Sequence, residues 1–286
     1  MAMRARTTGR GDVRSRKPAR AAPHSATLSL CVVLTALATG CRTGTADAPS
    51  AVSSSVTVRY EQPSGADRGD AAFLRTRKLP EAAAAGVGAL VALDPPVVMV
   101  LRSCGGEGSA YDPGARRMEI CYEEISETRD LYRAAGQRAS DDVLSAVMLE
   151  TLFHESAHAV LDVLDLPLSA REEDRADQFA ALMLLREGAE GQRRLLSAAR
   201  TWRLSAIIYE NADDGRQDDH STDEQRAVNH LCYLYGADPA RHTDLVGPRS
   251  LPARRARGCE REWKRVQTAW TDALGAETDP TSHAGS

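Results

Sequence analysis

The stretch TLFHESAHAVLDVLDLPLSAREEDRADQFAALML, residues 151–184, places two histidines four residues apart with a glutamate between them. Residues four apart on an α-helix share a face, so His154 and His158 can direct their imidazoles at one ion. Glu155 lies about 100° round the helix from His154, where its carboxylate can accept a proton from a water molecule beside that ion. The pattern predicts a metal-dependent hydrolase. The alternative is an amphipathic helix whose histidines only cap a core.

The segment after this helix contains the candidates for a third ligand. A catalytic zinc site usually has three protein ligands, and the histidines supply only two. Leu166-Pro167 ends the first helix, and a second helix over about residues 170–186 is expected to run back past it. Glu173, in the acidic first turn of that second helix, is predicted to be the third zinc ligand.

Asp177 lies one turn beyond Glu173 on the same face and has a shorter side chain. It is predicted to accept the ring N–H of a ligating histidine, a contact that fixes the tautomer of the ring. Glu172 and Asp174 point about 100° to either side of Glu173, so at most one of these three residues is expected to face the first helix squarely. The alternative is a solvated acidic face. Apolar residues on the same side favour a core instead: Ala176, Phe179, Ala180 and Met183.

Residues 1–40 are predicted to be an export signal. A basic segment with seven Arg or Lys residues is followed by an apolar run of about 14 residues, which is too short for a membrane-spanning helix. Ala38-Thr39-Gly40-Cys41 resembles a bacterial lipobox, so Cys41 is predicted to carry a lipid that anchors the protein to the membrane of the cell envelope. Residues 41–55 are then a polar tether. Cleavage at Ala36-Leu37-Ala38 is the alternative and predicts ordinary secretion.

The charge balance gives no sign of a nucleic-acid partner. The 286 residues carry a formal net charge of −4, and because seven basic residues and one acidic residue lie within residues 1–40, the remainder carries −10. No basic patch is expected on that remainder, and no nucleic-acid partner is predicted. Apolar residues make up 42% of the chain, which is enough for a substantial core.

Four of the six cysteines follow the predicted lipidation site. In an oxidising compartment they are expected to form disulfides, and four cysteines allow three connectivities. Cys104 and Cys121 flank a predicted hairpin, so they are paired, which leaves Cys232 with Cys259. Cysteine ligation of zinc is the alternative, but no CxxC spacing supports it.

The remaining pattern predicts one α+β domain over residues 56–275. It has a small N-terminal mixed or antiparallel sheet packed on the histidine helix, and a helical C-terminal half. Strands are predicted over residues 56–60, 97–101 and 116–122, with a turn at residues 111–114. Helices are predicted over about residues 70–92 (interrupted near Pro80), from 141 to Leu166-Pro167 with Ser140 as its cap, and over 170–186, 192–209, 223–235 and 260–273. Residues 211–219 and 248–258 are expected to be loops, and residues 276–286 a disordered tail.

HESAH followed by EDRAD resembles the gluzincin type of zinc peptidase, in which a Glu-x-x-Ala-Asp helix supplies the third ligand. Further blocks, AYDPGARRMEICYE at residues 110–123 and DDHSTDEQRAVNHLCYLYG at residues 218–236, resemble a bacterial family labelled "putative metallopeptidase", domain of unknown function 4344. The likeness covers roughly residues 70–265. It implies a zincin-like fold and a zinc-dependent peptidase, and no particular substrate. Gly108-Ser109-Ala110-Tyr111 departs from the Asn-Ala-Phe-Tyr-like run expected of the family.

The predicted function is hydrolysis of peptide bonds in a peptide or protein substrate. His154, His158 and Glu173 hold Zn²⁺, and Glu155 is the general base. His220 is predicted to stabilise the oxyanion, with Tyr111 and Tyr122 as alternatives. The strand over residues 116–122 is predicted to hold an extended substrate by strand addition.

Two other functions fit the same residues. One is an exported amidase of cell-wall peptides, which nothing in the sequence separates from a peptidase. The other is a lipid-anchored binding or assembly protein that keeps the metal for structure, which Glu155 disfavours because a structural site needs no base. No role is assigned to His230, predicted on a helix surface, or to His242 and His283, predicted in a loop and the tail.

Overall fold

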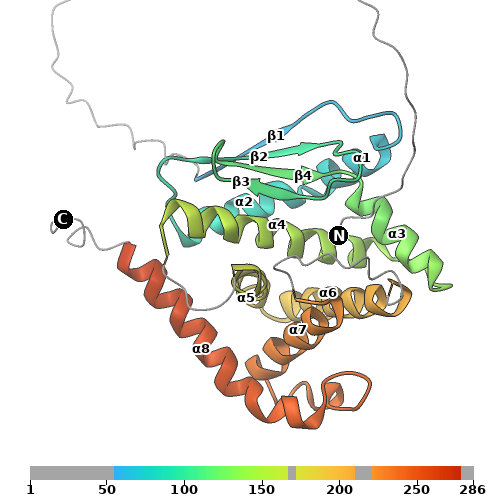
Figure 1. The fold of residues 1–286 in the computed structure, drawn as a ribbon, viewed down its shortest axis with the longest axis vertical. Coiled ribbons are helices and arrows are strands. Elements are labelled where there is room, and N and C mark those ends of the chain that lie inside the picture. Colours follow the sequence, from blue (N-terminus) through green and yellow to red (C-terminus); the bar gives the residue numbers. More distant parts are fainter. Residues whose placement is uncertain (1–54, 167–171, 210–220, 278–286) are drawn as a thin grey trace, which may run out of the picture. The chain divides into compact units, whose positions relative to one another are not determined.

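The computed structural model of the protein describes residues 55–166, 172–209 and 221–277 (Figure 1). The predicted export signal, residues 41–54 of the predicted tether with Cys41, His220 and the predicted loop over residues 211–219 lie outside the described residues, as do residues 278–286 of the predicted tail. Ser55, the last residue of the predicted tether, is instead buried and donates to the carbonyl of Val91 at 3.1 Å. Within the described part of the chain, no helix is both long enough and apolar enough to cross a membrane.

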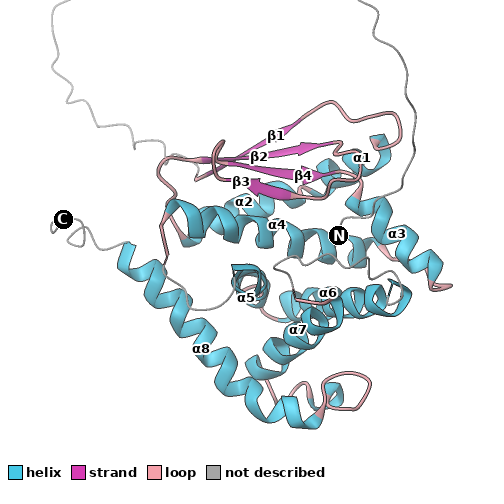
Figure 2. Ribbon diagram, in the orientation of Figure 1, coloured by secondary structure: helices cyan, strands magenta, loops and turns pink. Residues whose placement is uncertain are grey.

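A four-stranded mixed sheet forms the upper layer of the domain in Figure 2. Its order is β1 (Val56–Tyr60), β2 (Val97–Arg102), β4 (Arg117–Cys121) and β3 (Ala110–Asp112). The first three strands are parallel to one another, and β3 is antiparallel to β4. The three predicted strands are confirmed to within one residue at each end. The predicted turn over residues 111–114 is partly wrong, because its first two residues pair with β4 and make β3 an edge strand.

Helices cover one face of the sheet. The predicted helix over residues 70–92 is two helices, α1 (Arg68–Arg77) and α2 (Leu79–Leu90). Lys78 separates them with a φ of 52°, and Pro80 stands in the first turn of α2, where it removes no helical hydrogen bond. The helix α4 (Asp141–Val163) contacts both α2 and the β3–β4 side of the sheet. Alternate residues of β2 and β4, Met99, Leu101, Met118 and Ile120, are fully buried and form the core.

Four further helices form the other half of the domain: α5 (Glu172–Leu185), α6 (Ala189–Tyr209), α7 (Asp223–Ala237) and α8 (Ala253–Glu277). α4 contacts α5 and α6, so it is the element shared by the sheet and the helical half (Figure 1). Ser140 caps α4 as predicted, because its side chain accepts a hydrogen bond from the N–H of Val143. The described residues therefore form a mixed α+β domain, mostly helical, with a small sheet.

Two local predictions fail, both in highly charged segments. Residues 248–258 were expected to form a loop, but α8 already begins at Ala253, because Arg is a good helix former and Pro252 stands just before the helix. The helix α3 (Glu124–Ala134) was not predicted. Its buried residues Ile125 and Leu131 are separated by charged residues that obscure the helical period.

Both predicted disulfides are present. Cys104 and Cys121 have a Cα–Cα distance of 5.4 Å and enclose the β3–β4 hairpin. Cys232 and Cys259 have a Cα–Cα distance of 5.1 Å and join α7 to α8. The first disulfide ties down the edge of the sheet, and the second ties the C-terminal helix to the helical half.

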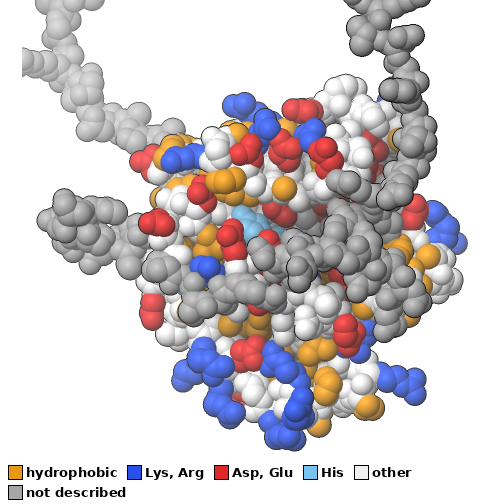
Figure 3. Space-filling view, viewed as in Figure 1, with side chains coloured by type: hydrophobic (Ala, Val, Ile, Leu, Met, Phe, Trp, Pro, Cys, Tyr) orange, Lys and Arg blue, Asp and Glu red, His pale blue; other side chains and the backbone are white. Residues whose placement is uncertain are grey.

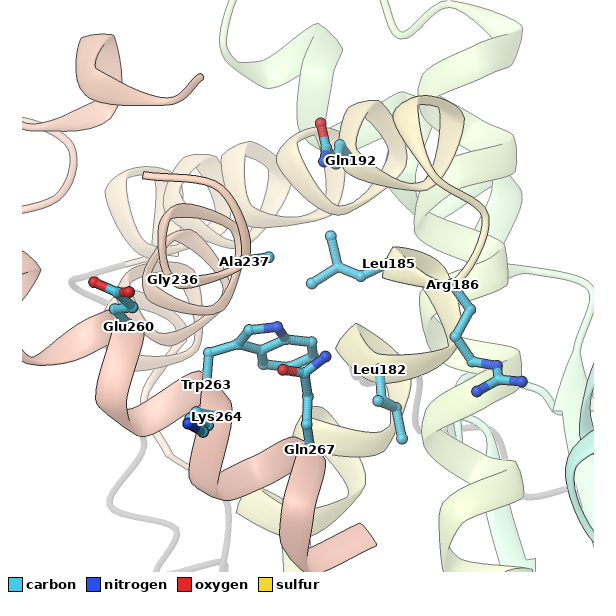
Figure 4. Close-up of a pocket in the computed structure, with 10 residues that line it drawn as sticks. All are labelled: Leu182, Leu185, Arg186, Gln192, Gly236, Ala237, Glu260, Trp263, Lys264 and Gln267. Carbon is cyan, nitrogen blue, oxygen red and sulfur yellow. The ribbon is translucent and has the colours of Figure 1, made fainter. Parts of the chain in front are cut away.

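A hollow of about 530 Å³ lies between α5, α7 and α8 (Figure 4). Trp263, Leu182 and Leu185 provide its apolar lining, and Arg186 and Lys264 stand at its margin. None of the predicted metal ligands lines it, so this hollow is separate from the HExxH region.

Candidate metal centre

The helix α4 brings the two histidines of the HExxH pattern together. Their ring centroids are 5.1 Å apart, and their Nε2 atoms are 3.3 Å apart. His154 is 5% exposed, and Figure 3 shows histidine side chains at the surface between the sheet and the helical half. The two imidazoles therefore present their Nε2 atoms to a common point that is reached from outside.

Glu173 from α5 completes a group of three ligand atoms. Its Oε2 lies 3.1 Å from His154 Nε2 and 3.6 Å from His158 Nε2. Hence the structure brings together all three residues that the sequence predicts as ligands. They form one of the groups in the described part of the chain whose geometry suits a metal ion.

In each histidine, Nδ1 also contacts a carboxylate, and both carboxylates come from α5. Asp177 Oδ1 lies 2.9 Å from His154 Nδ1, as the sequence analysis expected. Glu172 Oε1 lies 2.8 Å from His158 Nδ1, which the sequence analysis did not expect. The side chain of Glu172 stays 60% exposed, so it reaches His158 without facing α4 squarely. Glu172 is the first residue of α5, and its side chain is long enough to reach His158.

A buried network continues inward from Asp177 and was not predicted. Arg226 on α7 donates from Nε to Asp177 Oδ2 at 2.9 Å and from Nη2 to Asp177 Oδ1 at 2.5 Å. His230 Nε2 lies 2.9 Å from Glu150 Oε1 on α4. The prediction that His230 lies on a helix surface is wrong, since it is 0% exposed. The spacing of four between Arg226 and His230, and between Glu150 and His154, was the available signal.

The network displaces the pKa values of its members. Burial alone lowers the pKa of His154, but its hydrogen bonds with Asp177 and Glu173 raise the pKa to about 10. Burial raises the pKa of Asp177, but Arg226 and His154 outweigh it and hold that pKa far below its usual range. Asp177 is therefore ionised as a carboxylate, and the surroundings of the two histidine rings favour a positive charge at their nitrogen atoms. A metal ion competes with protons for that position.

Glu155 is 7% exposed, follows His154 directly on α4 and interacts electrostatically with all three predicted ligands. Its burial raises the pKa of its carboxyl; the two histidines lower it, and Glu124 and Glu173 raise it. Glu124 is itself held in place, because its Oε1 accepts a hydrogen bond from the N–H of Ser109 at 3.1 Å. The carboxyl of Glu155 is thus shifted towards the range where it can exchange protons near neutral pH.

Two other groups of potential ligands among the described residues do not suit an ion. Glu150, His154 and Asp177 lie close enough together, but the guanidinium of Arg226 already supplies the cation between them. Cys104 and Cys121 lie near Glu123, but they are joined in a disulfide and offer no thiolate. This leaves the group of His154, His158 and Glu173.

The two tyrosines proposed as oxyanion donors differ in the structure. Tyr122 is 0% exposed and donates its hydroxyl to the carbonyl of Glu61 at 2.8 Å, so it is not available to a substrate. Tyr111 on β3 donates to Asp162 Oδ2 at 2.7 Å, one helical turn beyond His158. Burial and Asp162 raise the pKa of Tyr111 above its usual value, so its hydroxyl stays protonated, and in this structure its one hydrogen is donated to Asp162.

The comparison with known families agrees with this site. The family domain of unknown function 4344, described as "Putative metallopeptidase", matches residues 60–274. Because the match spans most of the chain, the protein belongs to this family. The family description indicates a metal-dependent peptidase and hence a hydrolase. No curated protein and no solved structure matches the chain significantly.

Proposed function

We propose that the protein is a zinc-dependent peptidase with a zincin-like site in which His154, His158 and Glu173 hold Zn²⁺. The observation that carries this proposal is the spacing of the three ligand atoms, 3.1, 3.3 and 3.6 Å. Zinc binds nitrogen and oxygen tetrahedrally at about 2.0–2.1 Å, which requires ligand atoms about 3.3–3.4 Å apart. Two imidazoles and one carboxylate are also the chemistry of a catalytic zinc site, which keeps one position for water or substrate.

Glu155 acts as the general base in this proposal. Zn²⁺, when bound, lowers the pKa of a water molecule and polarises the scissile carbonyl. Glu155 accepts the proton of the attacking water and delivers it to the leaving amine. Its burial beside the ligands supports this role, since a raised pKa brings a carboxylate closer to the pH at which it must both accept and release a proton.

We propose that β3 binds the substrate, in place of β4, which corresponds to the strand predicted for this role over residues 116–122. β4 is paired with β2 on one side and, over residues 117–119, with β3 on the other, so neither edge of β4 is open along its length to strand addition. β3 is the edge strand next to β4, and Ala110 and Asp112 are exposed. Tyr111 joins it to α4 through Asp162, near the histidines. An extended peptide paired with β3 has its backbone held by main-chain hydrogen bonds beside the metal centre.

His220 remains the proposed oxyanion donor. It lies outside the described residues, but its neighbour in the chain, Ser221, donates to Asp174 at 2.7 Å. Asp174 follows Glu173 directly on α5, so the chain next to His220 is anchored close to the third proposed ligand. A neutral or protonated imidazole can donate the hydrogen bond that a developing oxyanion needs.

The proposed location is the cell envelope, through a lipid on Cys41. Replacing the thiol removes the site of lipid attachment, so Cys41→Ser is expected to move the protein from the membrane fraction to a soluble fraction. An unchanged distribution, with mature protein that begins at Thr39, would favour ordinary secretion instead.

Glu155→Gln tests the catalytic proposal, because the amide keeps the shape of the side chain and cannot accept the proton. We expect bound zinc to persist while turnover of a peptide library falls by about 10²-fold or more. Glu190→Gln, at an exposed position on α6, is the matched control and should keep full activity. Full activity in Glu155→Gln would refute the mechanism, and cleavage of cell-wall peptides alone would favour the amidase.

A further inference from the structure

The helices α4 and α7 each direct two residues, spaced four apart, into the same part of the interior. These are Glu150 and His154 on α4, and Arg226 and His230 on α7. The side chains of Glu150, Arg226 and His230 are 2%, 9% and 0% exposed. A buried charge is tolerated only when it is paired and hydrogen-bonded, so these residues are present as one network and not as separate ions.

Arg226 donates hydrogen bonds from Nε and Nη2 to the two oxygens of the Asp177 carboxylate. The same Oδ1 atom of Asp177 that accepts from Nη2 contacts Nδ1 of His154. A guanidinium that binds a carboxylate through two parallel N–H groups fixes its plane as well as its distance. The orientation of Asp177, and through it that of the His154 ring, therefore depends on Arg226.

The guanidinium of Arg226 also contacts Trp202 and Glu150. Its Cζ lies 3.7 Å from the centroid of the Trp202 ring, and its Nη2 lies 3.6 Å from Glu150 Oε1. Glu150 in turn is held by His230. Opposite charges and an aromatic face therefore surround the guanidinium. Burial lowers the pKa of Arg226, but Asp177 and Glu150 outweigh it and raise that pKa further above the usual value. A lysine carries the same charge but has no planar fork to match the carboxylate.

We infer that Arg226 is a positioning residue of the metal centre, which holds Asp177 in the orientation that presents Nε2 of His154 to the metal, with Glu150 and His230 holding Arg226. This inference rests on the proposed zinc site and goes beyond it by assigning three residues of α4 and α7 to metal affinity. Arg226 touches no substrate. Its Nη2 also lies 3.3 Å from Nδ1 of His154, but a guanidinium has no acceptor for the hydrogen that Nδ1 donates to Asp177, so we assign its effect to Asp177.

The test compares the zinc affinity of Arg226→Lys with that of the unaltered protein, by competition with a chelator. Groups that orient a ligating histidine contribute about 10–100-fold to metal affinity, and we expect about tenfold weaker binding in Arg226→Lys. Thermal unfolding of each metal-free protein checks that the fold persists. The matched control is Arg203→Lys on α6, because Arg203 pairs with Glu224 and donates to the backbone carbonyls of residues 249 and 250 instead of to Asp177. It should bind zinc like the unaltered protein.

A double variant separates positioning from a general structural role. If Arg226 acts through Asp177, then Asp177→Asn with Arg226→Gln should bind zinc no more weakly than Asp177→Asn alone. This pair also removes both buried charges together, so it remains informative if Arg226→Lys does not fold. Additive losses, or zinc affinity in folded Arg226→Lys equal to that of the unaltered protein, would overturn the inference. Absence of zinc binding by the unaltered protein would instead refute the proposed function.

A second inference comes from the outer face of α8. Five exposed basic residues lie on it: Arg254, Arg257, Arg261, Lys264 and Arg265. At about 100° per residue they fall within a sector of about 100°, opposite the buried side of the helix. That buried side contains Cys259, Trp263, Val266 and Trp270. Figure 3 shows Lys and Arg side chains gathered over the first half of α8.

These five residues of α8, called the basic stripe below, suit binding to a flat anionic surface. None of its five residues forms an ion pair with a described acidic residue, whereas Arg255 outside the stripe pairs with Glu262 at 2.6 Å. Among the described residues, the one large hydrophobic side chain that is exposed is Ile207 on α6, so α8 offers no exposed aromatic ring for stacking bases. The stripe runs along one straight helix on the surface. The prediction that this part of the chain has no basic patch is therefore wrong, because a net charge of −10 averages over the whole remainder of the chain and conceals a local stripe.

We propose that the basic stripe of α8 contacts the anionic headgroups of a lipid bilayer. Each Lys or Arg close to such a surface increases binding by about fivefold, so five of them form a substantial supplementary contact beside a lipid anchor. The proposal needs the protein to be outside the cytoplasm at a membrane, as the export signal predicts.

Co-sedimentation with vesicles tests this contact, with the Cys41→Ser protein so that no lipid anchor masks it. We expect binding to phosphatidylglycerol vesicles and none to phosphatidylcholine vesicles, with a loss of about 100-fold when Arg257, Arg261 and Arg265 are replaced by Gln. The control, with the same change of charge, replaces the exposed Arg59, Arg68 and Arg138 by Gln. Equal binding to both vesicles, an equal loss in the control, or binding to a soluble polyanion without binding to vesicles would overturn the proposal.

Discussion

Asp177 and Glu172 make the same kind of contact with the two histidines in different surroundings, and this predicts different effects on metal affinity. The distances are 2.9 Å for Asp177 and 2.8 Å for Glu172. The side chain of Asp177 is 5% exposed, and that of Glu172 is 60% exposed. The perturbations are Asp177→Asn and Glu172→Gln, which keep the size of each side chain and remove its charge.

The size of each effect follows from solvent screening. A buried carboxylate that orients a ligating histidine contributes about 10–100-fold to metal affinity, which corresponds to about 1.4–2.7 kcal/mol. An exposed ion pair contributes about 0.2–1 kcal/mol, which is at most about fivefold. The exposed contact should also weaken in salt, since the screening length falls to about 3 Å at 1 M. The loss in Asp177→Asn should therefore be about tenfold or more at any salt concentration, and that in Glu172→Gln about fivefold or less and absent at high salt.

The assay is competition with a chromophoric chelator for zinc, at low ionic strength and at about 1 M salt. Asp177→Asn leaves Arg226 without its partner, so the unfolding of the metal-free variant must be measured in parallel. Equal losses in the two variants at both salt concentrations would refute the reasoning from exposure. A loss confined to Glu172→Gln would show that His158, and not His154, depends on its carboxylate.

Two further predictions concern folding. A Cβ atom on Gly236 would lie 2.4 Å from the carbonyl oxygen of Cys259, so Gly236→Ala should lower the free energy of unfolding, measured by chemical denaturation, by about 3 kcal/mol. A Cβ atom on Gly258 would have no atom within 4 Å, so Gly258→Ala should raise that free energy by up to about 1 kcal/mol. Similar effects of both substitutions would refute the close approach of α7 and α8. Burial raises the pKa of Glu150, but His230 and Arg226 outweigh it, so the folded pKa lies below the ordinary value of 4.5. The stabilisation is then complete above that value and is lost as the pH falls, so the deficit of Glu150→Gln in unfolding free energy should be constant near pH 7 and shrink below about pH 4.5. A deficit that grows on acidification would contradict the assigned direction.

Much of this protein follows from local sequence pattern. The spacing of His154 and His158, with Ser140 as a cap, is sufficient to place the HExxH helix, because helical periodicity and capping depend on residues within a few positions of one another. The apolar runs of β1 and β2 are predicted for the same reason. The pairing of the cysteines also follows, because Cys104 and Cys121 are separated by a short hairpin whose closure is local.

Other features depend on contacts between distant parts of the chain. The edge position of β3, which moves the proposed peptide contact away from β4, is set by the order of the strands in the sheet. Arg226 and Asp177 are 49 residues apart, and His230 and Glu150 are 80 residues apart. In a sequence, the spacing of four between Arg226 and His230 is equally typical of a solvated helix face. Only the packing of α7 against α5 and α6, with α6 against α4, removes water from them, and burial is what turns these charges into a single network around the metal centre.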